Sequence, residues 1–134
     1  MVFVDILEEL VRAYPEREAF RYRDAESGEV RSVRFDRFLE DVSRAAAYWS
    51  EKQKSLSPEE PFRVGIAADN SYPYFVEYLG VIAAGGVFVP LNQSFGAARV
   101  LEFAAEIGIP YMMAGEAQLA DSEYAAELNA AYPA

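Results

Sequence analysis

Asp69, Asn70 and Ser71 have side chains and a position in the sequence that could serve binding chemistry. They directly follow residues 64–68, a short apolar run that predicts a buried strand. Ligands of α/β proteins bind at the carboxyl ends of parallel strands, so Asn70 and Ser71 are candidate substrate-binding residues. Asn and Ser are also preferred N-caps, and a helix is predicted directly after them. The cap is the favoured interpretation.

Two residue types that often carry catalysis or bind metals are absent from the sequence. The chain has no histidine, the commonest general base and metal ligand, and no cysteine, which excludes disulfides, thiolate metal sites and a cysteine nucleophile. The acids of residues 102–127 lack the tight carboxylate spacing of a metal site, and we interpret them as a solvated helix face. The sequence therefore predicts no catalytic residue and no metal site within the chain.

The charge and hydropathy of the 134 residues exclude several partners. Twenty-two acidic against 12 basic residues give a net charge of −10, which repels the phosphates of nucleic acids and anionic lipid surfaces. The N-terminus lacks the basic stretch of a signal peptide. The most apolar region, residues 74–91, is interrupted by Glu77 and Pro90, so we expect no membrane insertion and a cytoplasmic protein.

The N-terminal part of the chain predicts a helix, a hairpin and a second helix. Residues 3–14 place Phe3, Ile6, Leu7, Leu10 and Val11 on one helical face. Residues 19–23 and 30–35 alternate apolar with polar around a turn at 24–28, which is typical of a β-hairpin. Asp36 is the predicted N-cap of a helix that extends to about Gln53. Its buried stripe is predicted as Phe38, Leu39, Val42, Ala45, Ala46 and Trp49.

From residue 61 onward the sequence predicts a βαβαβ unit. Apolar strands at residues 64–68, 87–91 and 109–113 alternate with helices at 73–84 and 97–107. Strands this evenly spaced, and apolar throughout, favour a parallel sheet. The predicted fold class is α/β, a mostly parallel sheet with flanking helices preceded by a small hairpin. A single helix with a thin apolar stripe at Leu119, Leu128 and a tyrosine is expected after Gly115.

Two further features have both a functional and a structural interpretation. The aromatic residues Tyr72, Tyr74, Phe75 and Tyr78 could line an acyl pocket, but Phe75 and Tyr78 share a helical face with Leu79 and Ile82, which favours core packing. The two consecutive glycines at residues 85–86 could suggest a nucleotide-binding loop. Phosphate-binding glycines follow a strand, however, whereas this pair precedes one, so we expect it to end a helix.

Two stretches resemble the opening motifs of the adenylate-forming superfamily, which includes acyl-CoA synthetases, luciferases and the adenylation domains of peptide synthetases. Residues 34–46 resemble the family's Thr-Tyr-x-Glu-Leu opening and the helix after it, with Arg34 and Arg37 in place of Thr and Glu. Residues 78–92 resemble Tyr-Leu-Gly-x-x-x-Ala-Gly-Gly-x-x-x-Pro-Leu-Asn/Asp. The likeness covers about residues 20–115. Asn92 favours acyl-CoA ligases over peptide synthetases, although Gln93 and Ser94 replace the proline and basic residue common after it.

The resemblance implies ATP, magnesium and CoA for a complete enzyme. The family's Ser/Thr/Gly-rich phosphate loop ending in Pro-Lys and its later catalytic lysine have no counterpart here, and the last lysine is Lys54. We therefore expect a single domain over residues 1–134, the N-terminal subdomain of a larger AMP-forming ligase and itself structural rather than catalytic. Its parts are a helix, hairpin and helix (1–60), the βαβαβ unit (61–115) and a C-terminal helix or tail (116–134).

The implied parent is an acyl-CoA synthetase of fatty acid metabolism that makes an acyl-adenylate and then a thioester. The implied partners are the downstream ligase domains, and we expect the isolated chain to self-associate. Two alternatives stay open: a fragment of a peptide-synthetase adenylation domain, or a free-standing α/β binding module of the flavodoxin or receiver type.

Overall fold

The computed structural model describes residues 2–24 and 26–133, and within the first helix it describes side chains from Val4 onward. The chain divides into two compact units. The first unit comprises Met1–Ser55 and Ser71–Ala84, and the second comprises Leu56–Asn70 and Gly85–Ala134. One helix of the predicted βαβαβ unit thus belongs by its contacts to the N-terminal elements.

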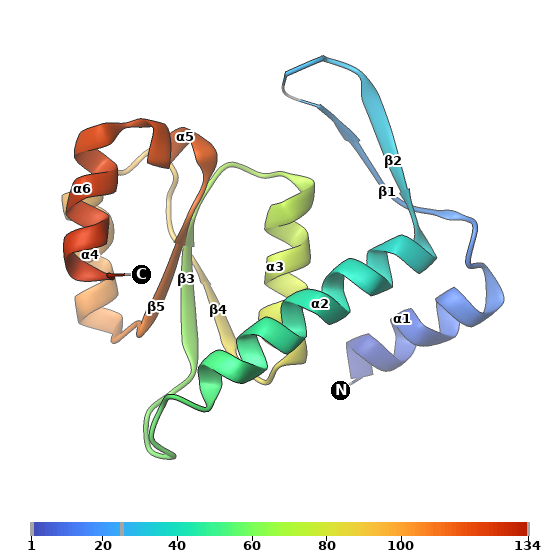
Figure 1. Cartoon of the computed structure of the whole chain (residues 1–134), viewed down its shortest axis with the longest axis horizontal. Helices are drawn as coiled ribbons and strands as arrows, with labels where there is room; N and C mark the ends of the chain where they lie inside the picture. Colours follow the sequence, from blue (N-terminus) through green and yellow to red (C-terminus); the bar gives the residue numbers. More distant parts are fainter. Residues whose placement is uncertain (1, 25, 134) are drawn as a thin grey trace. The chain divides into compact units, whose positions relative to one another are not determined.

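The first unit consists of three helices and the predicted hairpin (Figure 1). In chain order its elements are α1 (Val2–Ala13), β1 (Glu18–Arg23), β2 (Val30–Arg34), α2 (Phe35–Gln53) and α3 (Tyr72–Ala83). β1 and β2 pair antiparallel, which confirms the hairpin. The core of this unit joins α1, α2 and α3 through Leu7, Phe38, Val42, Ala45 and Val76.

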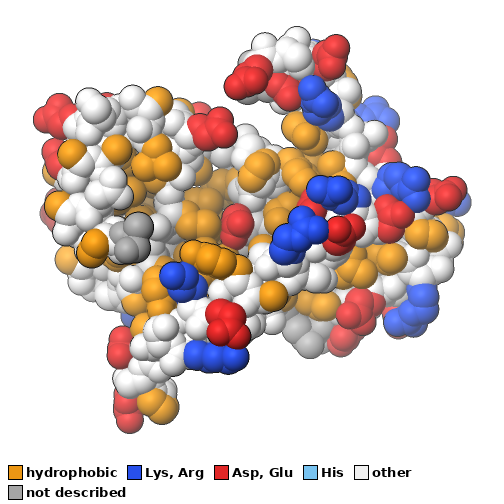
Figure 2. Space-filling model, viewed as in Figure 1, with side chains coloured by type: hydrophobic (Ala, Val, Ile, Leu, Met, Phe, Trp, Pro, Cys, Tyr) orange, Lys and Arg blue, Asp and Glu red, His pale blue; other side chains and the backbone are white. Residues whose placement is uncertain are grey.

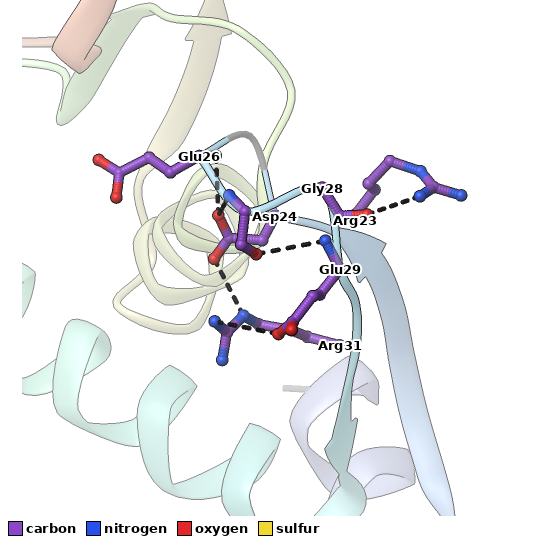
Figure 3. Close-up of polar contacts among 7 residues, drawn as sticks. Arg23, Asp24, Glu26, Gly28, Glu29 and Arg31 are labelled. Carbon is purple, nitrogen blue, oxygen red and sulfur yellow. Dashed lines mark hydrogen bonds and ion pairs between the residues drawn. The ribbon is translucent and has the colours of Figure 1, made fainter.

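The hairpin turn is held by the carboxylate of Asp24 (Figure 3). One oxygen accepts the backbone N–H groups of Glu26 (2.8 Å) and Ser27 (3.1 Å), and the other accepts Nε of Arg31 at 2.9 Å. The hydrogen bonds from the Ser27 and Glu26 backbones lower the pKa of Asp24, because they favour the ionised form. Gly28 completes the turn with a φ of 73°. Ala25, inside the predicted turn, lies outside the described residues.

The predicted N-cap of α2 is wrong. The helix begins at Phe35, with Arg34 at the cap position and no side-chain cap bond. Asp36 lies in the first turn, where its carboxylate accepts a 2.7 Å bond from Arg34. The loop before the hairpin replaces the cap: the N–H groups of Phe35 and Asp36 donate to the backbone oxygens of residues 17 and 15 at 2.9 and 3.1 Å.

Helices α2 and α3 approach each other closely at one glycine. A Cβ built on Gly80 would lie 2.5 Å from Cβ of Ala45 and 3.1 Å from its carbonyl carbon. Any side chain at position 80 would therefore force the helices apart. The predicted stripe of α2 is confirmed. The structure buries Phe38, Val42, Ala45 and Trp49, and the other two members, Leu39 and Ala46, are half-buried.

The second unit is a three-stranded parallel sheet with helices on one face. Its strands are β3 (Arg63–Ala67), β4 (Val87–Pro90) and β5 (Tyr111–Ala114), in the order β4-β3-β5. Helices α4 (Ala97–Ile107) and α6 (Ser122–Ala131) lie side by side against it (Figure 1). The core between them consists of Ala67, Ala97, Val100, Tyr124 and Leu128. The predicted α/β class, parallel sheet and hairpin are confirmed.

The single helix predicted after Gly115 is wrong. Two helices follow β5, α5 (Glu116–Ala120) and then α6. Asp121 separates them: its backbone is extended, and its carboxylate accepts the N–H groups of Glu123 and Tyr124, both at 3.1 Å. The break rotates α5 relative to the predicted stripe, so Leu119 is 48% exposed and Gln118 is buried instead.

Helix α1 keeps its predicted face except at Ile6, which is 51% exposed. Leu7 is buried, Leu10 and Val11 are half-buried, and the side chain of Phe3 lies outside the described residues. Acidic and basic side chains intermingle over α1 and α2 on the face shown in Figure 2. Among the described residues, none of the helices combines the length and the apolar character needed to cross a bilayer.

Substitutions at Gly85 test the prediction that the glycine pair ends α3. Gly85 follows α3 with a φ of 86°, and a Cβ added there meets nothing within 4 Å. Backbone strain alone therefore opposes substitution. We expect Gly85→Val to reduce the free energy of unfolding by about 1–2 kcal/mol. Gly85→Asn, which tolerates the left-handed region, should be distinctly milder. Denaturant midpoints measure both, and equal midpoints for wild type and Gly85→Val would contradict the assignment.

Candidate functional site

Ser71 caps α3 and Asn70 precedes it. Ser71 has an extended backbone, and its Oγ accepts the N–H of Tyr74 at 3.2 Å. The favoured cap interpretation is therefore confirmed for Ser71. Asp69 and Asn70 are exposed at the carboxyl end of β3. A substrate-binding role for Asn70 or Ser71 stays a prediction.

A polar cluster of the first unit lies where α2 faces the start of α3. Oη of Tyr72 donates to Oδ2 of Asp41 at 2.7 Å. The other oxygen of Asp41 accepts Nε of Arg37 at 3.0 Å and lies 3.6 Å from the guanidinium of Arg44. Burial, and then the hydrogen bond to the Asp41 carboxylate and its charge, raise the pKa of Tyr72 well above its usual range. Tyr72 is thus a protonated donor at neutral pH.

A second hydrogen bond crosses the same pair of helices. Nε1 of Trp49 donates to Oε2 of Glu77 at 2.7 Å; the Trp49 side chain is buried and Glu77 is half-buried. An indole N–H in such a place needs an acceptor, and a carboxylate accepts it strongly. Glu77, which interrupts the apolar sequence of α3, therefore has a structural role in joining the helices.

An open hollow of about 240 Å³ lies between these two hydrogen bonds. Its lining combines charged, aromatic and apolar side chains: Asp41, Arg44, Ala45, Tyr72, Pro73, Val76 and Glu77. The carboxylates of the lining are engaged, Asp41 by Tyr72 and Arg37, and Glu77 by Trp49. The hollow offers no poised general base, and the described residues contain no group of three His, Cys, Asp or Glu side chains able to hold a metal ion.

The predicted buried face of α3 is wrong for its aromatic members. Phe75 and Tyr78 are 37% and 36% exposed, whereas Leu79 packs against the core and the helix buries Val76, Gly80 and Val81. The close approach at Gly80 turns this smaller face toward α2. The aromatic side chains at the start of α3 pack on the hairpin instead: Tyr72 stacks on Tyr22 at 5.7 Å, and Phe75 lies 5.3 Å from Phe20 between ring centroids.

The second unit contains both solvated acids and a buried amide. The acidic side chains of residues 102–127 are exposed, as predicted. Gln118 is only 8% exposed, and its Oε1 has no hydrogen-bond partner among the described residues. It lies beside Gly115 and Ala68, where β3 and β5 end. Sequence reasoning missed this burial, because a glutamine in an alanine-rich helix has the pattern of a solvated residue.

The sequence and the fold of the chain are similar to those of known proteins. The family described as AMP-binding enzyme matches residues 7–133. The chain is 30% identical over 96 residues, 72% of its length, to the polyketide synthase PksN of Bacillus subtilis. It is 32% identical over 65 residues, 48% of its length, to a linear gramicidin synthase of Brevibacillus parabrevis. These matches span only 2% and 1% of the two synthases.

A solved structure has the same fold. The N-terminal domain of FACL13 from Mycobacterium tuberculosis superposes with a TM-score of 0.70, covering 98% of this chain and 29% of that one. The sequences are 17% identical, so this likeness concerns the fold alone.

The bond between Tyr72 and Asp41 gives a pH-dependent test. We expect Tyr72→Phe to reduce the free energy of unfolding by about 1–2 kcal/mol at neutral pH. The folded-state pKa of Tyr72 is raised, so its contribution is complete below the unfolded pKa of about 10 and is lost as the pH rises through the folded value. The advantage of wild type should therefore shrink above about pH 10.

Tyr48→Phe is the matched control, because Tyr48 lies on α2, the helix that carries Asp41, and is 55% exposed. Its effect should stay within about 0.5 kcal/mol at neutral pH. Chemical denaturation between pH 7 and 11 measures all three proteins. A Tyr72→Phe variant as stable as wild type at pH 7 would show that the bond contributes nothing.

Proposed function

Because the chain belongs to the AMP-binding enzyme family, we propose that it forms the N-terminal part of an adenylate-forming ligase. Such an enzyme uses ATP and magnesium to convert a carboxylic acid to an acyl-adenylate and then transfers the acyl group to a thiol. The family match over residues 7–133 carries this proposal. It favours the ligase over the flavodoxin and receiver alternatives, whose sheets can have a similar strand order.

The role of this chain in that enzyme is structural. Gly80 permits the close approach of α2 and α3, Gly85 ends α3, and Ser71 begins it. The polar side chains that face the hollow hold these helices together. The chain spans 29% of the FACL13 domain. The phosphate loop and the later lysine of the resembled family have no counterpart in this sequence, so we expect those groups in the remaining length of such an enzyme.

The acceptor thiol divides the proposal into two branches. In the acyl-CoA synthetase branch it belongs to CoA, and the sequence argument for this branch is Asn92. The Oδ1 of Asn92 accepts the N–H and the hydroxyl of Ser94 at 2.9 and 2.7 Å, which closes the turn after β4. An aspartate would accept the same two bonds. Asn92 therefore supports neither branch over the other.

The peptide-synthetase branch has a separate observation in its favour. Both curated relatives are synthases by name, a polyketide synthase and a gramicidin synthase, and each is far longer than this chain. In this branch the activated acid is an amino acid and the acceptor is the thiol of a carrier domain. The two branches differ in substrate and acceptor but share the same first chemical step.

Exchange of radiolabelled pyrophosphate into ATP tests the structural role. We expect the purified 134-residue chain to show no exchange above background with any carboxylic or amino acid, because its sequence lacks the phosphate loop and any lysine after Lys54. Enzyme-dependent exchange by the chain alone would contradict the proposal. A known adenylating enzyme in the same assay is the positive control.

The protein translated from the complete reading frame gives the second arm of the same assay. We expect it to catalyse exchange, and the acid that supports exchange separates the branches. Amino acids, with thioester formation on a carrier domain, would support the peptide-synthetase branch, whereas other carboxylic acids with CoA would support the acyl-CoA branch. A soluble product of that frame that is inactive with both panels would contradict a ligase.

A further inference from the structure

The charges around the hollow between α2 and α3 differ from one lining residue to the next. The two helices lie side by side in the first unit (Figure 1). Where Asp41 lines the hollow, its carboxylate accepts Nε of Arg37 at 3.0 Å and lies 3.6 Å from the guanidinium of Arg44. The Arg44 guanidinium also lies 2.7 Å from a carboxylate oxygen of Glu40. The two positive charges on this side are therefore matched by two carboxylates.

Glu77 lines the same hollow without a basic partner. Its Oε2 accepts the indole N–H of Trp49 at 2.7 Å, and an indole is a neutral donor. No lysine or arginine among the described residues forms an ion pair with Glu77, and its Oε1 accepts no hydrogen bond from them. The side chain is half-buried, and a carboxylate partly withdrawn from water is stabilised by a nearby positive charge. Glu77 is therefore the unbalanced charge of the lining.

The size and the walls of the hollow limit what can supply that positive charge. Its volume of about 240 Å³ is below the roughly 300–1,000 Å³ of sites for drug-sized ligands. Ala45, Pro73 and Val76 form the apolar part of the lining. Such walls can cover the hydrocarbon stem of an amine while its charged head stays beside a carboxylate, as lysine side chains do on protein surfaces. A metal ion would need several oxygen ligands instead. The lining therefore suits a small organic cation.

We propose that this hollow binds the ammonium or guanidinium group of a short aliphatic cation. The charged head donates to Oε1 of Glu77, while Oε2 keeps the bond from Trp49. The stem lies over the apolar part of the lining, and Asp41 keeps its bond from Tyr72. The site thus combines one charge-assisted hydrogen bond with the burial of a short hydrocarbon chain.

Two sources share this chemistry. One is a free aliphatic amine, and the other is a lysine or arginine side chain from another segment of a longer enzyme. The second source rests on the proposed place of the chain in a ligase, whereas the first does not. In both cases α2 and α3 supply the whole lining, so the same residues of this chain recognise the cation.

The strength of binding follows from the open shape of the hollow. A cation there stays in contact with water and salt, which screen its attraction to Glu77. We therefore expect a Kd of about 1–10 mM for a free amine with a short stem. Added sodium chloride should raise this Kd, because the attraction is electrostatic.

The single tryptophan reports on this site, because its indole N–H donates to Glu77. Titration of the purified chain with n-butylammonium at constant ionic strength is followed by Trp49 fluorescence and by the NMR resonance of its indole N–H. We expect a saturable change in both signals, and none with n-butanol, which has the same stem without the charge. No saturable change up to about 100 mM, or an equal response to n-butanol, would overturn the proposal.

A pair of variants locates the binding at Glu77. Glu77→Gln keeps an oxygen that can accept the Trp49 N–H but removes the charge, and should weaken binding by about tenfold or more. Glu51→Gln changes the net charge equally on α2, where Glu51 is exposed and paired with Lys54 at 2.7 Å, and should leave binding unchanged. Far-ultraviolet circular dichroism checks that each variant folds. Binding kept in a folded Glu77→Gln, or lost in a folded Glu51→Gln, would overturn the proposal. If Glu77→Gln does not fold, the comparison of n-butylammonium with n-butanol on wild type decides.

The protein translated from the complete reading frame separates the two sources. Binding of n-butylammonium that Glu77→Gln abolishes, measured by calorimetry, would identify a free amine as the occupant. Absence of that binding, together with a larger loss of stability on Glu77→Gln than in the 134-residue chain, would identify a basic side chain of the enzyme itself. A complete protein that shows neither result would overturn the proposal. None of these measurements depends on ligase activity.

Discussion

The close approach of α2 and α3 at Gly80 is the contact on which the first unit depends. With a hydrogen atom at position 80, the backbones come near enough for Val42, Ala45 and Val76 to form one core. Two hydrogen bonds, from Tyr72 to Asp41 and from Trp49 to Glu77, then cross the same interface. A larger residue at position 80 would separate the helices and lengthen both bonds. This packing explains why α3 belongs with the N-terminal elements although it lies between two strands of the sheet in sequence.

The same packing gives physical meaning to the stretch that resembles the adenylate-forming family. Of its glycines, Gly80 provides the close approach and Gly85 the left-handed end of α3, and Asn92 closes the next turn through Ser94. These three roles position backbone and do not require a ligand. A motif shared with enzymes can therefore be a folding motif, and in this chain it contributes architecture to the proposed ligase.

Much of the fold was predictable because apolar periodicity and glycine positions determine it locally. The hairpin, the three parallel strands and the stop at Gly85 follow from such patterns. The errors arose where contacts distant in sequence decided the outcome. The backbone oxygens of residues 15 and 17 replaced the cap expected from Asp36, and the approach of Ala45 to Gly80 kept Phe75 and Tyr78 out of the buried face of α3. The cluster around Asp41 was not foreseen for the same reason, since Tyr72 lies 31 positions away.

A double-mutant cycle at Ala45 and Gly80 tests the central claim most directly, with the fluorescence of the single tryptophan, Trp49, as the probe of the interface. Gly80→Ala should destabilise the unit by about 1–3 kcal/mol, although alanine is the better helix former. Ala45→Gly alone should also destabilise it, by about 1 kcal/mol. If the two side chains compete for one space, the double variant will lose less than the sum of the single losses, by at least about 1 kcal/mol. Additive losses, within about 0.5 kcal/mol, would contradict the account.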